Sequence, residues 1–145
     1  MIDFKEKDEP DTRTELECFP EVDPGVEILG DRVLVQLRRE KVTSKGGIIL
    51  VDETRQTLKF NETVAKVRSI GPLAYKSPDD LTPWPEGPWC NVGDLVRTIK
   101  YGGDRFVVQP DDDGAAVVFI TLQAREVISK IKSFEAAQKM KAFVD

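Results

Sequence analysis

The chain has 145 residues, of which 40% are hydrophobic and 32% charged, and its formal net charge at pH 7 is -5. This length allows one domain with a buried core, and the negative charge disfavours binding to a nucleic-acid backbone, which requires clustered Lys and Arg. The chain contains no histidine, which excludes imidazole general bases, Ser-His and Cys-His nucleophile pairs and His metal ligands.

The first 26 residues are predicted to form an acidic N-terminal extension. Pro10, Pro20 and Pro24 interrupt it, and its composition buries too little apolar surface for it to fold alone. Leu16, Cys18 and Phe19 are the side chains that this extension offers for docking on the rest of the chain. Their spacing does not require such docking.

Residues 32–39 carry the clearest strand pattern. Val33, Val35 and Leu37 alternate with polar residues, a period that predicts a strand with one buried face. The polar residues are Arg32, Gln36 and Arg38.

The segment 43–51 contains two glycines followed directly by apolar residues. Gly46 and Gly47 precede Ile48, Ile49 and Leu50. One interpretation is a hairpin in which the glycines form the turn. The other is a flexible loop with an apolar tip, and the mostly polar residues 52–62, which lack sustained alternation, favour the loop.

Further short strands are expected at residues 63–70, 95–101, 105–109 and 115–121, separated by Gly- and Asp-rich turns such as Asp111–Gly114. This spacing predicts an all-β protein, a small barrel or sandwich. Residues 127–132 fit either a strand or a helix, and from Phe134 onward the apolar spacing favours a helix.

Residues 73–91 contain four prolines together with Trp84 and Trp89, which argues against a helix or a central strand. Two interpretations remain open. The segment folds on its own aromatic side chains, or it exposes a functional surface.

Motifs for catalysis or metal binding are absent from the sequence. Cys18 and Cys90 lie far apart without a C-x-x-C pair, which favours two reduced thiols in a cytoplasmic protein over a zinc site or a disulfide framework. The acidic residues Asp111, Asp112 and Asp113 lack the spacing of an EF-hand loop. We expect no enzymatic activity, no cofactor and no metal.

Membrane association is not expected either. The residues after Met1 show no basic region followed by an apolar run, so no signal peptide is expected. The longest apolar run, residues 115–120, is too short to cross a membrane.

Four stretches in one order resemble the GroES-type co-chaperonins, the 10 kDa chaperonin family. Residues 29–35 (LGDRVLV) are similar to the family's first strand, and residues 44–50 (SKGGIIL) to its mobile loop. Residues 92–96 (VGDLV) resemble its Val-Gly-Asp-x-Val turn, and residues 117–120 with 125–128 resemble its closing segments.

This resemblance implies a small GroES-like β-barrel at residues 27–132, which carries a flexible apolar-tipped loop and a roof-like insertion, followed by a helical tail at 133–145. Gly46, Gly47, Ile48, Ile49 and Leu50 would bind a GroEL-type chaperonin. Tyr101 would face the cavity in which non-native proteins are enclosed.

The resemblance also implies a homo-oligomeric ring of seven subunits. The expected interface residues are Leu29, Val33, Val127, Ile128 and Ile131, with residues 28–35 of one subunit pairing with residues 127–132 of the next. No nucleic acid and no membrane partner is implied.

The chain departs from the family pattern in its two extensions, in the longer loop after Leu50 and in the Pro/Trp-rich roof stretch. These departures favour a divergent member, for which a virus-encoded origin in a host cytoplasm is one expectation. The main alternative is an oligomeric β-barrel binding module that uses Trp84 and Trp89 as its contact surface. A zinc-dependent dehydrogenase domain lacks its His and Cys ligands here, and a single-strand-binding barrel is disfavoured by charge.

Overall fold

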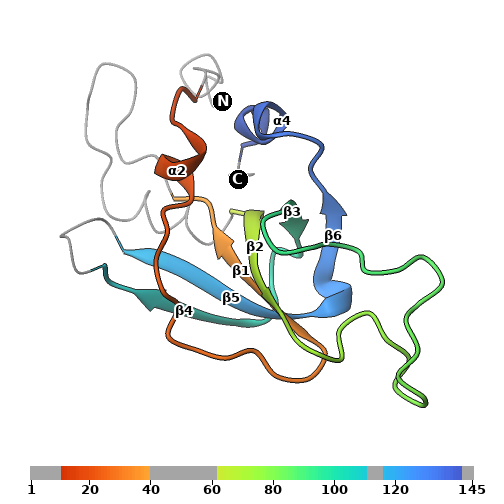
Figure 1. Ribbon diagram of the computed structural model, residues 1–145. Coiled ribbons are helices and arrows are strands. Elements are labelled where there is room, and N and C mark those ends of the chain that lie inside the picture. The colour runs from red at the N-terminus through yellow and green to blue at the C-terminus, as the bar shows by residue number, and fades with distance from the viewer. Residues whose placement is uncertain (1–10, 40–61, 111–115, 142–145) are drawn as a thin grey trace.

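The computed structural model describes residues 11–39, 62–110 and 116–141, which form one antiparallel sheet with a few short helices (Figure 1). The strands, in chain order, are β1 (Arg32–Leu37), β2 (Val64–Ile70), β3 (Leu95–Thr98), β4 (Asp104–Val108), β5 (Val117–Gln123) and β6 (Val127–Lys130). The helices are α2 (Glu15–Cys18), the 3-10 helix η1 (Ala124–Glu126) and α4 (Phe134–Lys139). The predicted all-β class is confirmed.

The sheet has the strand order β4-β5-β1-β2-β3-β6, so that β4 and β6 form its edges. β1 lies in the middle and pairs with β5 on one side and β2 on the other. A bulge between Leu34 and Val35 shifts its register with β2. Such a bulge adds local twist and bends the strand.

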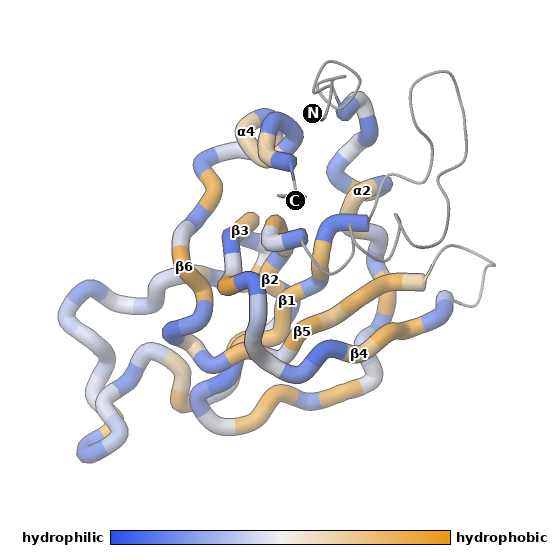
Figure 2. Tube along the Cα trace, turned by 180° about the vertical axis from the view of Figure 1, so that it is seen from behind, coloured by the Kyte–Doolittle hydropathy of each residue, from blue (hydrophilic) through white to orange (hydrophobic). Residues whose placement is uncertain are grey.

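The sheet curls around one main core. Buried side chains from β1, β2, β3, β5 and β6 belong to a single cluster. Val35, Val67, Val96, Ile120 and Val127 are among its members. Figure 2 shows β4 and β5 as largely hydrophobic, whereas the segment 73–91 is mainly hydrophilic along its projecting part.

The two terminal segments cover the outer face of the sheet. Cys18 and Phe19 are buried with Val64, Leu95 and Ala137 in a second cluster, against which Phe134 of α4 and its C-cap residue Met140 pack. Val22 and Ile28 pack in a third cluster against Leu34 and Phe119. Of the three docking residues considered from the sequence, Cys18 and Phe19 are buried and Leu16 is exposed.

This cover changes the expected environment of β1. The prediction of one solvent-facing side was wrong, because Gln36 and Arg38 are buried beneath the terminal segments. Gln36 donates to the Pro20 carbonyl at 2.9 Å and accepts a hydrogen bond from Arg68 Nε at 2.8 Å. Buried polar groups are tolerated where they are paired in this way.

The C-terminal region resolves the ambiguity left by the sequence. Residues 127–130 form strand β6, which pairs with β3, and α4 begins at Phe134 as expected. Ser133 caps α4 by accepting a hydrogen bond from the Ala136 amide. None of the helices in the described ranges has the length and apolar character of a transmembrane span.

Candidate functional site

The segment predicted to bind a chaperonin begins after β1 and ends before β2. Gly46, Gly47, Ile48, Ile49 and Leu50 lie outside the described residues, as does the acidic turn at 111–113. Both flanks of the segment 40–61 are described. They are Arg38 and Arg39 on one side and Glu62 and Thr63 on the other.

A buried ion pair joins the two flanks. Arg38 donates to both carboxylate oxygens of Glu62, from Nε at 3.0 Å and from Nη2 at 3.2 Å. The Arg38 amide also donates to the Val64 carbonyl at 3.0 Å. Glu62 Oε1 in turn accepts from the amides of Thr63 and Val64. The segment 40–61 therefore leaves and re-enters the sheet at adjacent positions.

The terminal segments contact the same flanks. Arg38 donates to the Ala137 carbonyl at 2.7 Å and to the Met140 carbonyl at 2.6 Å, at the end of α4. The Arg39 amide donates to the Cys18 carbonyl, and the Arg39 carbonyl accepts from Arg13 Nη1 at 2.7 Å. Figure 1 shows α2 and α4 at the same end of the molecule.

Arg13 is itself held by an ion pair with Asp11, whose shortest N–O distance is 2.7 Å. Burial raises the pKa of the Asp11 carboxyl, but the hydrogen bonds and charge of Arg13 outweigh burial and hold this pKa below its usual value. Asp11 is therefore ionised at neutral pH and keeps Arg13 directed at the Arg39 carbonyl.

The segment 73–91 folds on its own aromatic side chains, which is the first of the two interpretations left open by the sequence. Trp84 and Trp89 pack against each other at a centroid distance of 5.2 Å, and each lies within 5.6 Å of Tyr75. Tyr75 donates a hydrogen bond to the Ala124 carbonyl at 3.0 Å. An isolated bridge between Lys76 and Pro83 closes the projecting part.

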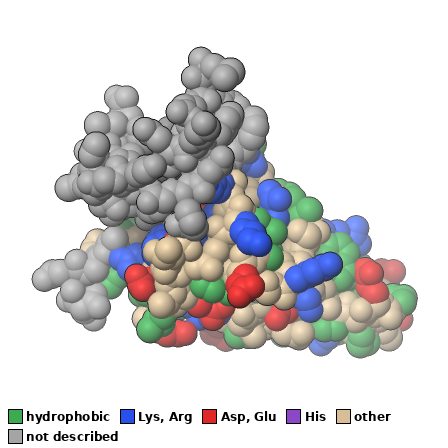
Figure 3. All heavy atoms as spheres, turned by 90° about the horizontal axis from the view of Figure 1, so that it is seen from above, with side chains coloured by type: hydrophobic (Ala, Val, Ile, Leu, Met, Phe, Trp, Pro, Cys, Tyr) green, Lys and Arg blue, Asp and Glu red, His purple; other side chains and the backbone are tan. Residues whose placement is uncertain are grey.

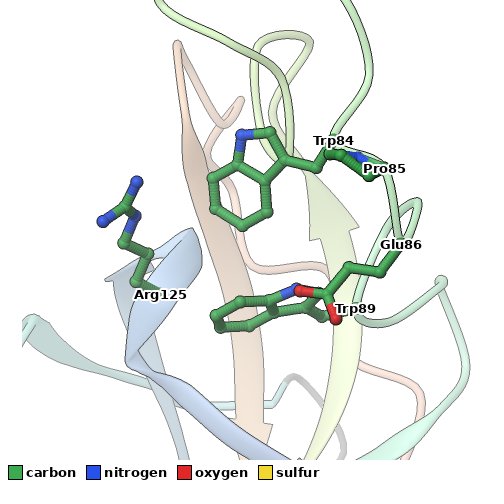
Figure 4. Close-up of a pocket in the computed structure, with 5 residues that line it drawn as sticks. All are labelled: Trp84, Pro85, Glu86, Trp89 and Arg125. Atoms are coloured by element: carbon green, nitrogen blue, oxygen red, sulfur yellow. The ribbon is translucent and has the colours of Figure 1, made fainter.

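An open pocket remains beside the two indoles (Figure 4). It has a volume of about 450 Å³, and Trp84, Pro85, Glu86, Trp89 and Arg125 line it. Arg125 extends from η1 toward Trp84, with its guanidinium carbon 5.2 Å from the ring centroid. Glu86 accepts the indole hydrogen bond of Trp89 at 2.5 Å. The indoles are thus partly covered from within the chain.

Tyr101 lies in the turn between β3 and β4 and is 78% exposed. Lys100 places its ammonium 5.4 Å from the Tyr101 ring centroid. Figure 3 shows acidic and basic side chains intermixed on the described surface visible in that view, without a region of one sign. Within the described ranges, no group of three or more Cys, Asp or Glu residues is placed to hold a metal ion.

The family model described as "Chaperonin 10 Kd subunit" matches residues 25–131. The chain belongs to this family. It is 33% identical over 104 residues to the co-chaperonin GroES of Chlamydia pneumoniae, an alignment that covers 72% of this chain and 88% of the relative. The co-chaperonin GroES of Chlamydia felis is 31% identical over 101 residues, which cover 70% and 85% of the two chains.

The matched range leaves α2 and α4 outside the family region of this GroES-type chain. The helices that contact the flanks of the segment 40–61 are therefore additions to the part that the chain shares with its family.

The five residues expected at a subunit interface of this co-chaperonin occupy two different environments. Leu29 and Ile128 are 66% and 61% exposed. Val33, Val127 and Ile131 are buried within the subunit. The side chains of Leu29 and Ile128 are the ones among these five that face outward.

One part of the expected subunit pairing was wrong. Residues 32–35 lie in β1, whose two edges are already occupied by β2 and β5. The Gly30 and Asp31 carbonyls accept hydrogen bonds from Leu73 and Ala124. Within the described part of the chain, the backbones of Ile28 and Leu29 form no hydrogen bond, and β6 pairs on one side only.

Sequence reasoning missed the ion pair of Arg38 and Glu62. The two residues are separated by 24 positions, and both were placed on polar, solvent-facing stretches. A charged residue at each end of one loop was the available signal, but pairing across that loop becomes visible only when β1 and β2 are aligned.

Proposed function

We propose that this protein caps a GroEL-type chaperonin ring and closes the chamber in which non-native proteins fold, without catalysing a reaction itself. The membership of residues 25–131 in the chaperonin 10 family carries this proposal. The buried ion pair of Arg38 and Glu62 supports it, because this pair holds together the two flanks of the segment 40–61.

Ile48, Ile49 and Leu50 are the proposed anchors in the partner chaperonin, with Gly46 and Gly47 as their hinge. Burial of an aliphatic side chain contributes about 1.5 to 3 kcal/mol, whereas ordering the backbone costs about 1 to 2 kcal/mol per residue. The two contributions are similar, so one such loop binds weakly.

A ring overcomes this weakness. The proposed seven copies share one scaffold, so that each contact after the first is intramolecular and the modest affinities multiply. A change in the nucleotide state of the chaperonin that weakens each contact slightly then releases the whole cap. Weak individual loops make the cycle reversible.

The rest of the chain is assigned within the same proposal. The sheet of residues 27–132 is the ring unit, and residues 1–26 and 133–145 are additions to it. Tyr101 is assigned to the wall of the enclosed chamber, and the exposure of its ring in the protomer supports this assignment. The assembly works in the cytoplasm, which for a viral member is the cytoplasm of the host.

The substitution Ile49→Asp tests the anchors. A charge buried in an apolar contact is costly, so the variant should form the normal ring by native mass spectrometry but lose co-elution with a chaperonin and nucleotide. Thr57→Asp, which adds the same charge to the same segment outside the apolar tripeptide, should retain binding. Normal binding of Ile49→Asp would refute the assignment.

A further inference from the structure

Residues 11–19 and 134–141 meet beside the described flanks of the segment 40–61. Gln138 of α4 donates to the Arg13 carbonyl at 2.6 Å, and Arg13 donates to the Arg39 carbonyl. On the other side, the carbonyls of Ala137 and Met140 accept from Arg38. We call Arg13, Cys18, Ala137, Gln138 and Met140 the terminal clasp.

Arg38 depends on this clasp for its hydrogen bonds. A guanidinium group carries five N–H donors and is costly to bury unless they are paired. Glu62 accepts hydrogen bonds on one side of the group, and the carbonyls of Ala137 and Met140 accept two more. With α4 displaced, a charged group that is now 7% exposed would lose two of its acceptors.

Arg39 depends on the N-terminal segment in a comparable way. Its amide donates to Cys18 and its carbonyl accepts from Arg13, so that both backbone groups are fixed by residues outside the family match. Phe19 and Ala137 are buried together beneath this network, so that residues 18–19 and α4 share one apolar cluster. The last described residues before position 40 are thus held on two sides.

We propose that the terminal clasp positions the two flanks of the chaperonin-binding segment and thereby sets the affinity of this protein for its chaperonin. This inference rests on the proposed function. Flanks that are already ordered reduce the entropy lost on binding, which is the general effect of preorganisation. In a ring, a small loss per subunit is multiplied over all copies.

The test measures the flanks and the binding separately. The double variant Arg13→Ala with Gln138→Ala removes the side-chain bonds of the clasp, and Thr12→Ala with Lys139→Ala changes two exposed neighbours as the matched control. Amide hydrogen exchange at Arg38, Arg39 and Val64 in the free protein reports the flanks. Co-elution and titration with a GroEL-type chaperonin and nucleotide report the binding.

We expect the clasp variant to exchange its Arg39 amide at least tenfold faster and to bind the chaperonin at least tenfold more weakly, with the control within twofold of the unmodified protein. A second variant, Arg38→Met with Glu62→Met, replaces the buried pair by apolar side chains of similar length and should show the same loss of affinity while it remains folded.

Two results would overturn this inference and leave the proposed function intact. These are unchanged exchange at the flanks in the clasp variant, and faster exchange with unchanged or tighter binding. If the unmodified protein does not bind a chaperonin, the proposed function fails and the affinity claim fails with it, and the exchange data still show whether the clasp holds the flanks.

Discussion

At the scale of single residues, Tyr75 shows how this fold uses an unfavourable backbone conformation. Its φ angle is +61°, a region that side-chain-bearing residues rarely adopt. The cost is offset because the ring enters the core, packs on both tryptophans and donates to Ala124. The sequence gives no sign of this, since Tyr75 lies in a proline-rich stretch without periodicity.

Tyr75→Phe is expected to lower the free energy of unfolding by about 1 to 3 kcal/mol, because the buried Ala124 carbonyl loses its donor. Urea denaturation measures this effect. Tyr101→Phe, at the exposed tyrosine, is the control and should change little.

The same side chain predicts an alkaline limit to stability. Burial, followed by the hydrogen bond with Cys90, raises the pKa of Tyr75 above its ordinary value of 10.0. The unfolded chain therefore ionises first, and the contribution of Tyr75 is complete below about pH 10 and declines as the pH rises further. Tyr75→Phe should reduce this decline, and an equal decline in the variant would contradict the argument.

At the scale of elements, local sequence patterns predicted the positions of the strands correctly more often than they predicted which strand residues are buried. The alternation of Val33, Val35 and Leu37 identified β1 correctly, because strand period is a local property. The predicted solvent exposure of Gln36 and Arg38 was wrong, because the residues that cover them, such as Pro20 and Ala137, lie far away in sequence. The capping box of Thr14 and Glu17 was a local signal for α2 that the composition of the extension obscured.

Gly71 follows the last residue of β2, and the backbone around it leaves no room for a side chain. A Cβ at this position would collide with the Gly30 carbonyl oxygen and lie 2.9 Å from that of Arg32. Gly71→Ala should therefore lower the free energy of unfolding by about 3 kcal/mol, since backbone atoms must move. Thermal or urea unfolding measures it.

Gly87→Ala provides the matched comparison. Gly87 has a φ of +72° but no atom within 4 Å of an added Cβ, so only backbone strain of about 1 kcal/mol is expected. If the two substitutions lowered the free energy of unfolding equally, the backbone contact at Gly71 would not account for the effect of Gly71→Ala.

At the scale of the whole molecule, the sheet leaves two edges, β4 and β6, and exposed edges invite pairing with another chain. Ile128 projects outward from β6, and Leu29 lies exposed just before β1. We propose that β6 of one subunit pairs with residues 28 and 29 of the next. The sequence alone did not reveal that residues 32–35 cannot pair with another subunit, because β2 and β5, which occupy both edges of β1, come from distant parts of the chain.

Ile128→Asp should leave the protomer folded, since the side chain is exposed, but prevent ring formation by placing a charge in the apolar contact. Native mass spectrometry would then detect protomers. Val107→Asp, which adds the same charge to an exposed position on the opposite edge strand, should preserve the ring. A complete ring formed by Ile128→Asp would exclude this interface.

Residues 11–19 and 134–141 both lie beside Arg38 and Arg39, which has a practical consequence for labelling. A dye attached within either of these segments would lie next to the surface proposed to engage the chaperonin, and would obstruct it. The projecting turn at Pro78, Asp79 and Asp80 is exposed and lies away from α2 and α4 (Figure 1). Dyes attached through this turn would report on capping without crowding the docking end.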